Sequence, residues 1–144
     1  MFSRKVLILV LVGLVVLAIA RAPIFETRQI KLELEIADDE AERVRGLSGR
    51  ASLPADHGLL FIFDQPTRPG FWMKEMNFPI DIIWLDENRR VLALNELVSP
   101  ASYPQTFFPP APIKYVLEVN AGWAQRNKLK IGERADFIHR LDQK

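Results

Sequence analysis

Apolar residues beyond residue 21 come in short runs of strand length, and this limits the fold more than any other feature of the sequence. Residues 59–63 (LLFIF) are wholly apolar, and a run of this length is typical of a buried strand rather than a helix. Residues 29–36 (QIKLELEI) instead alternate apolar and polar side chains, which predicts a strand with one buried face. The sequence predicts about six short strands, at residues 29–36, 59–63, 80–85, 90–98, 113–119 and 135–141.

Two short helices are predicted between these strands. With Asp39 as N-cap, Glu42 has the spacing of a capping box, and Gly46 or Gly49 can end this helix. The residues predicted to form its inner face are Ala41, Val44 and Leu47. The second helix is predicted to begin at residue 120 or 121 and to run to residue 127.

The order of these elements predicts the fold class. Residues 86–89 join two neighbouring strands as a hairpin, and no regular alternation of strands with helices is seen. We therefore expect a mainly β, compact and barrel-like domain of about six strands with two short helices, of the α+β kind.

The first twenty residues resemble an export signal. Arg4 and Lys5 precede an uncharged, strongly apolar run at residues 6–20, which ends in small residues before Arg21. As a helix this run reaches about 22 Å, which is short for a bilayer core of about 30 Å. The predicted organisation is a signal peptide or N-terminal membrane anchor at 1–20, a linker at 21–28 and one globular domain at 29–144. Either form places the domain outside the cytoplasm, in the periplasm or anchored to the membrane.

The composition argues against several classes of partner. Lys and Arg number 19 and Asp and Glu 18, so the net charge is +1, and no basic cluster indicates nucleic acid. Cysteine is absent, which excludes disulfides and thiolate metal sites. Nothing in the sequence indicates a cofactor.

Four motifs occur in one order and resemble a known family. They are residues 42–47 (ERVRGL), 58–63 (GLLFIF), 71–74 (FWMK) with 79–82 (PIDI), and 116–122 (VLEVNAG). Together they are similar to domain-of-unknown-function family 192, small bacterial and archaeal domains that are often exported. The resemblance spans about residues 29–139 and implies a compact β-rich fold with short helices. It implies no known catalytic residues, because the resemblance brings no established activity with it.

Two acidic residues lie within apolar strands. Asp81 and Glu118 each share a strand face with apolar residues, and a carboxylate there needs a charged or hydrogen-bonding partner. We expect Asp81 to pair with an arginine, Arg43 or Arg50. The alternative is that the two acids form the paired acid/base site of an envelope hydrolase.

An aromatic set favours a ligand-binding surface. Five prolines lie within residues 100–112, and stiff loops that carry aromatic side chains lose little entropy on binding. Trp72 is expected to share a depression with at least one of Tyr103, Phe107 and Phe108; the alternative is a hydrophobic cluster that covers one end of the barrel. The ligand-binding candidates are Trp72, Met73, Tyr103, Phe107, Phe108, Arg43 and Arg50.

A soft-metal site is a further alternative. Met73 and Met76 have a Met-x-x-Met spacing, and with His57 they could hold Cu(I) outside the cytoplasm. Both methionines could instead fill the core.

The first functional hypothesis is an exported, non-enzymatic domain that binds a small ligand, a glycan or an envelope protein. The alternatives are the envelope hydrolase and the copper-binding protein.

Overall fold

The computed structural model describes residues 27–138. The predicted signal or anchor at 1–20 and most of the predicted linker lie outside the described residues. Within 27–138 no helix has the length and apolar character needed to cross a membrane.

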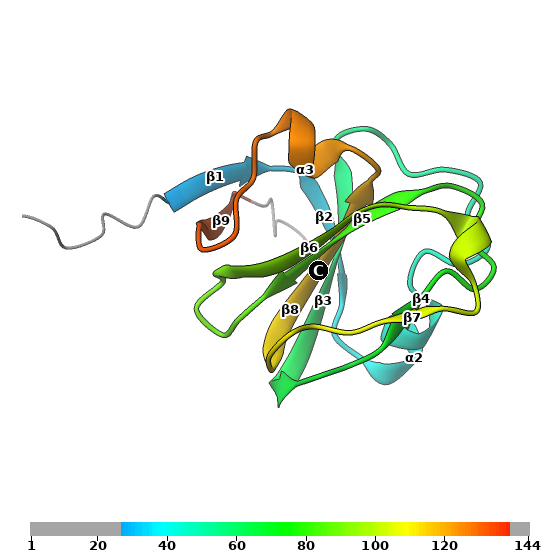
Figure 1. Ribbon diagram of the computed structural model, residues 1–144, viewed down its shortest axis with the longest axis horizontal. Helices are drawn as coiled ribbons and strands as arrows, with labels where there is room; N and C mark the ends of the chain where they lie inside the picture. The colour runs from blue at the N-terminus through cyan, green and yellow to red at the C-terminus, as the bar shows by residue number, and fades with distance from the viewer. Residues whose placement is uncertain (1–26, 139–144) are drawn as a thin grey trace, which may run out of the picture.

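A five-stranded sheet forms the centre of the domain (Figure 1). Strands β2 and β3 are parallel, and the remaining neighbours are antiparallel. In sheet order the strands are β2 (Glu33–Ala37), β3 (His57–Thr67), β8 (Ile113–Asn120), β5 (Ile80–Leu85) and β6 (Val91–Val98). The hairpin predicted at residues 86–89 joins β5 to β6, as expected.

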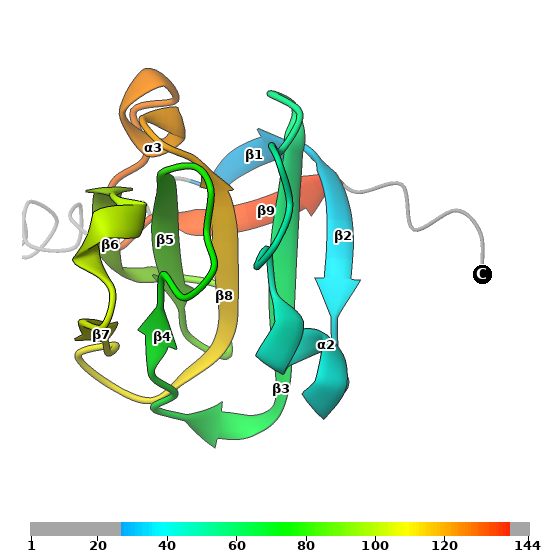
Figure 2. The same ribbon diagram turned by 90° about the vertical axis from the view of Figure 1, so that its right-hand side faces the viewer.

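Two smaller sheets complete the fold. β1 (Thr27–Lys31) pairs in parallel with β9 (Arg134–Ile138), and β4 (Phe71–Trp72) pairs antiparallel with β7 (Thr106–Phe107). Figure 2 shows β1 and β9 on one side of the large sheet and α2 with β4 on the other. The fold is mainly β with two short helices, as predicted.

The strands do not close into a barrel, so this part of the prediction is wrong. The predicted strand 29–36 is divided at Leu32, where the chain leaves the β1–β9 sheet and enters the large sheet. The alternation of apolar and polar side chains nevertheless continues across this break, because Ile30 and Leu32 are both buried in the same core. The described residues therefore contain nine short strands rather than about six.

Both faces of the large sheet are covered by apolar cores. One core lies under β1, β9 and α3, and includes Ile30, Ala135 and Trp123. The other lies on the opposite face, where Phe61 and Leu47 are buried. All residues of β5 are buried, which explains why its sequence is a nearly continuous apolar run.

Helix α2 (Glu40–Arg45) begins and ends as predicted. Asp39 is the N-cap and accepts a hydrogen bond from the Glu42 amide at 2.7 Å, and the helix ends at Gly46, whose φ is +50°. The prediction that Val44 faces inward is wrong, because its side chain is 72% exposed. Leu47, just beyond the helix, is the buried residue instead.

The helix α2 also connects two parallel strands, an arrangement that the sequence pattern does not indicate. β2, α2 and β3 form one strand–helix–strand crossover. One six-residue helix carries too little periodicity to indicate a crossover. This crossover places α2 above β3, at the edge of the second core.

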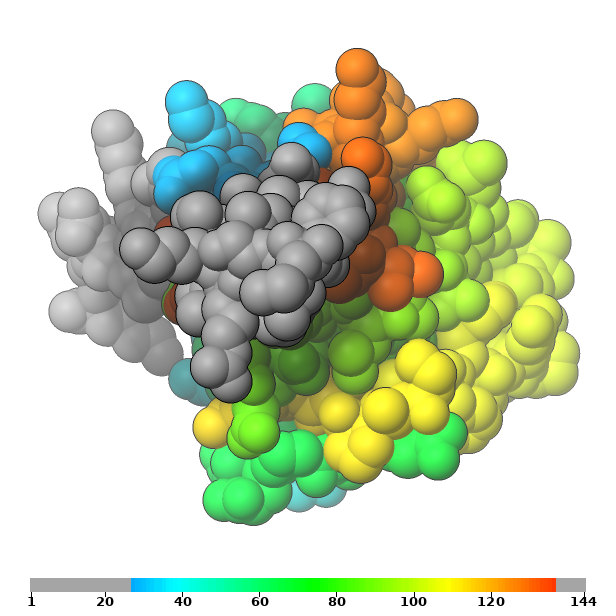
Figure 3. Space-filling model, turned by 60° about the vertical axis from the view of Figure 1, so that its left-hand side comes forward, coloured from blue at the N-terminus to red at the C-terminus, as the bar shows by residue number. Residues whose placement is uncertain are grey.

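The proline-rich segment 100–112 is held against the domain by short regular elements. It contains a 3₁₀ turn (Pro100–Ser102) and β7, which pairs Phe107 with Phe71 of β4. Figure 3 shows the segment, in yellow, on the surface near the chain of β6. The second predicted helix is α3 (Trp123–Arg126), whose Trp123 is buried.

Candidate functional site

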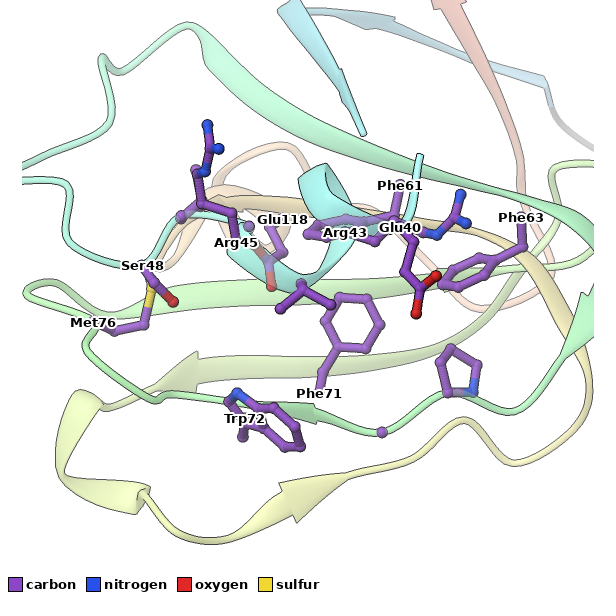
Figure 4. Close-up of a pocket in the computed structure, with 15 residues that line it drawn as sticks. Glu40, Arg43, Arg45, Ser48, Phe61, Phe63, Phe71, Trp72, Met76 and Glu118 are labelled. Carbon is purple, nitrogen blue, oxygen red and sulfur yellow. The ribbon is translucent and has the colours of Figure 1, made fainter. Parts of the chain in front are cut away.

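A pocket of about 230 Å³ lies between α2 and β4, above the large sheet (Figure 4). One wall comes from α2 and the turn after it: Glu40, Arg43, Val44, Arg45, Gly46, Leu47 and Ser48. The opposite wall comes from the chain around β4: Pro69, Gly70, Phe71, Trp72 and Met76. The sheet provides Phe61 and Phe63 from β3 and Glu118 from β8.

Glu118 is the unusual residue of this pocket. Its side chain is only 6% exposed, and among the described residues its carboxyl makes no hydrogen bond and no ion pair. Burial raises the pKa of Glu118 to about 8, and the positive charge of Arg50 offsets part of this rise. The carboxyl is therefore mostly protonated at neutral pH.

The strand register explains why Glu118 has no partner. Glu118 lies opposite Leu59 of β3 and Ile82 of β5, which offer no polar side chain. Side chains directly opposite on neighbouring strands point to the same face. Glu118 therefore faces the apolar core on the pocket side of the sheet.

The nearby arginines are bound to other groups. Arg50 forms two hydrogen bonds to the carboxylate of Glu35, at 2.7 and 2.8 Å. The Arg43 guanidinium donates to the carbonyl oxygens of Asp38 and Ile62, and lies 5.3 Å from the ring centroid of Phe63. Both arginines hold the chain around the pocket in place.

Packed aromatic rings hold the β4 wall of the pocket in place. Phe71 packs edge to face on Phe61, with ring centroids 4.8 Å apart, and on Trp84, at 5.3 Å. The indole N–H of Trp84 donates to the Asn95 side chain at 2.7 Å. Trp72, by contrast, is 51% exposed at the pocket. The inner part of this wall is therefore rigid, and Trp72 is accessible to a ligand.

Asp81 lies away from the pocket and has no arginine partner, so that prediction is wrong. Its carboxylate is fully buried and accepts hydrogen bonds from the backbone N–H groups of Leu97 (2.9 Å), Gly122 (3.0 Å) and Ala124 (2.9 Å). The free N–H groups at the start of a helix need such acceptors. Asp81, on β5, therefore caps α3. Its carboxylate is satisfied by these backbone N–H groups and does not require an arginine.

The structure does not bring Asp81 and Glu118 together. Asp81 is opposite Val119, whereas Glu118 is opposite Ile82, so the two side chains point to opposite faces of the sheet. A paired-carboxylate site needs both acids in one cleft. The predicted hydrolase geometry is therefore absent.

The three soft-metal candidates are placed in different surroundings. Met73 is buried in the core, and Met76 lines the pocket. His57 is not a pocket residue; its Nε2 lies 3.2 Å from a Glu33 carboxylate oxygen. Among residues 27–138, no group of three or more His, Asp and Glu side chains could hold a metal ion.

The four aromatic candidates also lie in different surroundings. Trp72 lines the pocket, but Tyr103, Phe107 and Phe108 do not. Phe107 packs partly buried against the core, and Tyr103 and Phe108 are exposed. The proline-rich segment thus supports β4 through strand pairing instead of forming the pocket wall.

Sequence reasoning missed several pocket residues. The sequence indicates Phe61 and Phe63 only as members of a core strand, and it gives no site signal for Arg45. The motif ERVRGL at residues 42–47 was the available signal, since most of it lines the pocket. The Ser48 hydroxyl donates to the carbonyl of Lys74 at 2.9 Å and ties this turn to the segment after β4.

Fold and pocket together define a small, mainly β domain with a buried carboxyl in an aromatic-lined pocket. Residues 23–137 match the family DUF192, described as "Uncharacterized ACR", and the chain belongs to this family. This confirms the resemblance seen in the sequence.

Individual relatives agree with this assignment. A UPF0127 protein of Pyrococcus furiosus is 28% identical over 116 residues, which are 76% of this chain and 90% of that protein. A crystal structure from Sinorhizobium meliloti 1021, described as a candidate transcription regulator, is 32% identical, with a TM-score of 0.68 over 72% of this chain and 79% of that one. A protein of unknown function from Novosphingobium aromaticivorans is 31% identical, with a TM-score of 0.68 over 72% of this chain and 73% of that one.

Proposed function

We propose that this domain is a non-enzymatic binding module that holds a small ligand in the pocket between α2 and β4. The observation that carries the proposal is the carboxyl of Glu118, buried and without a partner in the described chain. A ligand that reaches the pocket can complete its hydrogen bonding.

The cost of Glu118 to the fold supports this role. Glu118 is almost wholly withdrawn from water, and this withdrawal has a cost in stability that no hydrogen bond within the described residues offsets. An apolar side chain between Leu59 and Ile82 would avoid this cost and extend the core. Groups that lower the stability of the fold in this way are expected at functional sites. A titratable group in a pocket whose pKa is perturbed is a candidate functional residue.

Binding is favoured over catalysis by the position of the other buried acids. Asp81 caps α3 on the opposite face of the sheet, and Glu133 pairs with Arg28 at 3.0 Å. Within residues 27–138, Glu118 therefore has no neighbouring buried carboxylate with which to share acid and base roles.

We also propose that the domain works outside the cytoplasm. The basic, apolar and small-residue pattern of residues 4–20 supports export. The description of the Sinorhizobium meliloti protein points toward transcription regulation. A net charge of +1 gives this chain little attraction for DNA phosphates and favours a small ligand.

A thermal-shift screen of a diverse library of small metabolites tests the binding proposal. Compounds that raise the melting temperature of the parent should lose their effect in Glu118→Gln and in Trp72→Ala. The matched control is Glu87→Gln, which makes the same change at an exposed position in the β5–β6 turn. The proposal is wrong if no compound stabilises the parent, or if the stabilisation is unchanged in both pocket variants.

A further inference from the structure

We infer that the ligand is an organic cation, an ammonium group on a short carbon chain, whose charge lies against the Glu118 carboxylate among the rings of Phe71 and Trp72. This inference rests on the proposed binding function and names the class of ligand.

Among the described residues, no positive group is paired with Glu118. Arg50 is held by Glu35 through two hydrogen bonds, and Arg43 by two backbone carbonyls. Arg45 lines the pocket, but its guanidinium points away from Trp72 (Figure 4). A buried carboxylate requires a positive or hydrogen-bonding partner, and here the ligand must supply it.

The walls of the pocket have the chemistry that attracts a cation. Ring faces attract cations, and the pocket already contains one such contact, between Arg43 and Phe63 at 5.3 Å. Phe71 and Trp72 lie on the opposite wall, and Met76 adds a polarisable sulfur. Figure 4 shows Glu118 between the α2 wall and these residues. A small ammonium group can thus lie against the carboxyl and the rings at once.

Glu118 loses its proton when a cation binds. Burial raises the pKa of this group to about 8, so before a cation binds the carboxyl is mostly neutral at pH 7. The cation binds the ionised form, and binding therefore releases the proton to solvent. Affinity for a permanently charged ligand should rise about tenfold between pH 7 and pH 9, as the fraction of ionised Glu118 rises from about a tenth to about nine tenths.

The other charged groups around Glu118 do not reverse this expectation. They are Glu35 on β2, and Glu40, Arg43, Arg45 and Arg50 from α2 and the segment after it. Pairing with Arg50 lowers the pKa of Glu35, so this carboxylate stays ionised from pH 7 to pH 9. Arginine stays charged throughout this pH range. β3 and β5 place the apolar Leu59 and Ile82 opposite Glu118.

The experiment is calorimetry on the full chain with three probes of equal chain length: n-butylammonium, n-butanol and butyrate. We expect butylammonium to bind at least about tenfold more tightly than either other probe at pH 9, because only the cation forms a charge-assisted contact with Glu118. We expect its affinity to fall about tenfold at pH 7, with release of one proton detected in buffers of different ionisation enthalpy.

Two variants and one control test whether butylammonium binds in the pocket. Glu118→Gln should abolish both the preference for the cation and the pH dependence, while Glu87→Gln should keep both. Trp72→Ala, at a half-exposed position, should weaken butylammonium binding without unfolding the domain.

The cation inference is overturned if butanol or butyrate binds as well as butylammonium, or if none of the three binds. Neither result by itself contradicts the proposed function, which the library screen tests separately. A library hit that depends on Glu118 but is neutral or anionic would keep the binding module and reject the cation.

Discussion

Asp81 and Glu118 are buried acids on the neighbouring strands β5 and β8, and they point to opposite faces of one sheet. Asp81 accepts three backbone hydrogen bonds and caps α3. Glu118 has none within the described chain and lies in a pocket. The same functional group thus stabilises the fold on one face and is available to a ligand on the other.

Replacing Asp81 by alanine should destabilise the domain strongly. The change leaves the N–H groups of Leu97, Gly122 and Ala124 without an acceptor, at a cost of about 3–5 kcal/mol. Urea denaturation followed by circular dichroism measures this loss. The control Glu87→Ala, at an exposed position, should stay within about 0.5 kcal/mol of the parent. An Asp81→Ala curve that coincides with that of the parent would contradict the capping role.

Glu118 should make the domain less stable as the pH rises. Its folded pKa of about 8 lies above the ordinary value of 4.5, so the folded state binds the proton more tightly than the unfolded state. Stability is then highest below about pH 4.5 and falls as the pH rises to about 8. The parent should lose on the order of 4 kcal/mol relative to Glu118→Gln over this range.

Urea denaturation of both proteins at pH 5, 7 and 9 tests this effect. Glu35 and Glu133, whose pKa values are lowered by pairing with Arg50 and Arg28, act in the opposite direction at acid pH. They are present in both proteins and cancel in the difference. A constant stability difference between parent and variant across the three pH values would disprove the raised pKa.

Removing the charge of Arg50 should raise the pKa of Glu118 further. The positive charge of Arg50 favours the ionised carboxyl through space, although the guanidinium itself is bonded to Glu35. Carbon-13 NMR of the side-chain carboxyl should give a higher titration midpoint in Arg50→Met. The control Lys128→Met changes an exposed charge next to α3 and should leave the midpoint in place. An unchanged midpoint in Arg50→Met would mean that the two groups do not interact.

The two neighbouring aromatic residues of β4 should respond differently to truncation. Phe71→Ala removes the ring that packs on Phe61 and Trp84 and should cost about 3 kcal/mol or more. Trp72→Ala removes a half-exposed ring and should cost about 1 kcal/mol or less. Thermal denaturation distinguishes them. Equal losses would show that Trp72 belongs to the core and would weaken its role in the pocket.

The N-terminal pattern predicts a mature protein that begins at Arg21. Small residues at positions 18 and 20 are those that a signal peptidase selects. N-terminal sequencing of protein from the envelope fraction should find Arg21, and replacing Ala18 and Ala20 by phenylalanine should block cleavage. Recovery of the intact parent chain, still carrying residues 1–20, would favour the anchor.

Short-range patterns in the sequence are sufficient to predict most of the individual strands and helices of this protein. Short apolar runs specify β5, β6 and β8, and Asp39 and Gly46 specify the ends of α2, because period and capping act between residues close in the chain. The four ordered motifs were also sufficient to indicate the family.

Which of these elements pair with one another depends on the tertiary fold. The splitting of the first predicted strand at Leu32 and the crossover from β2 to β3 depend on pairing with strands distant in sequence. The roles of Asp81 and Glu118 also depend on strand pairing. A shift of one residue in the register of a strand moves each of its side chains to the opposite face of the sheet. Asp81 therefore meets the N–H groups of α3, while Glu118 meets the pocket, although both were buried acids in apolar strands.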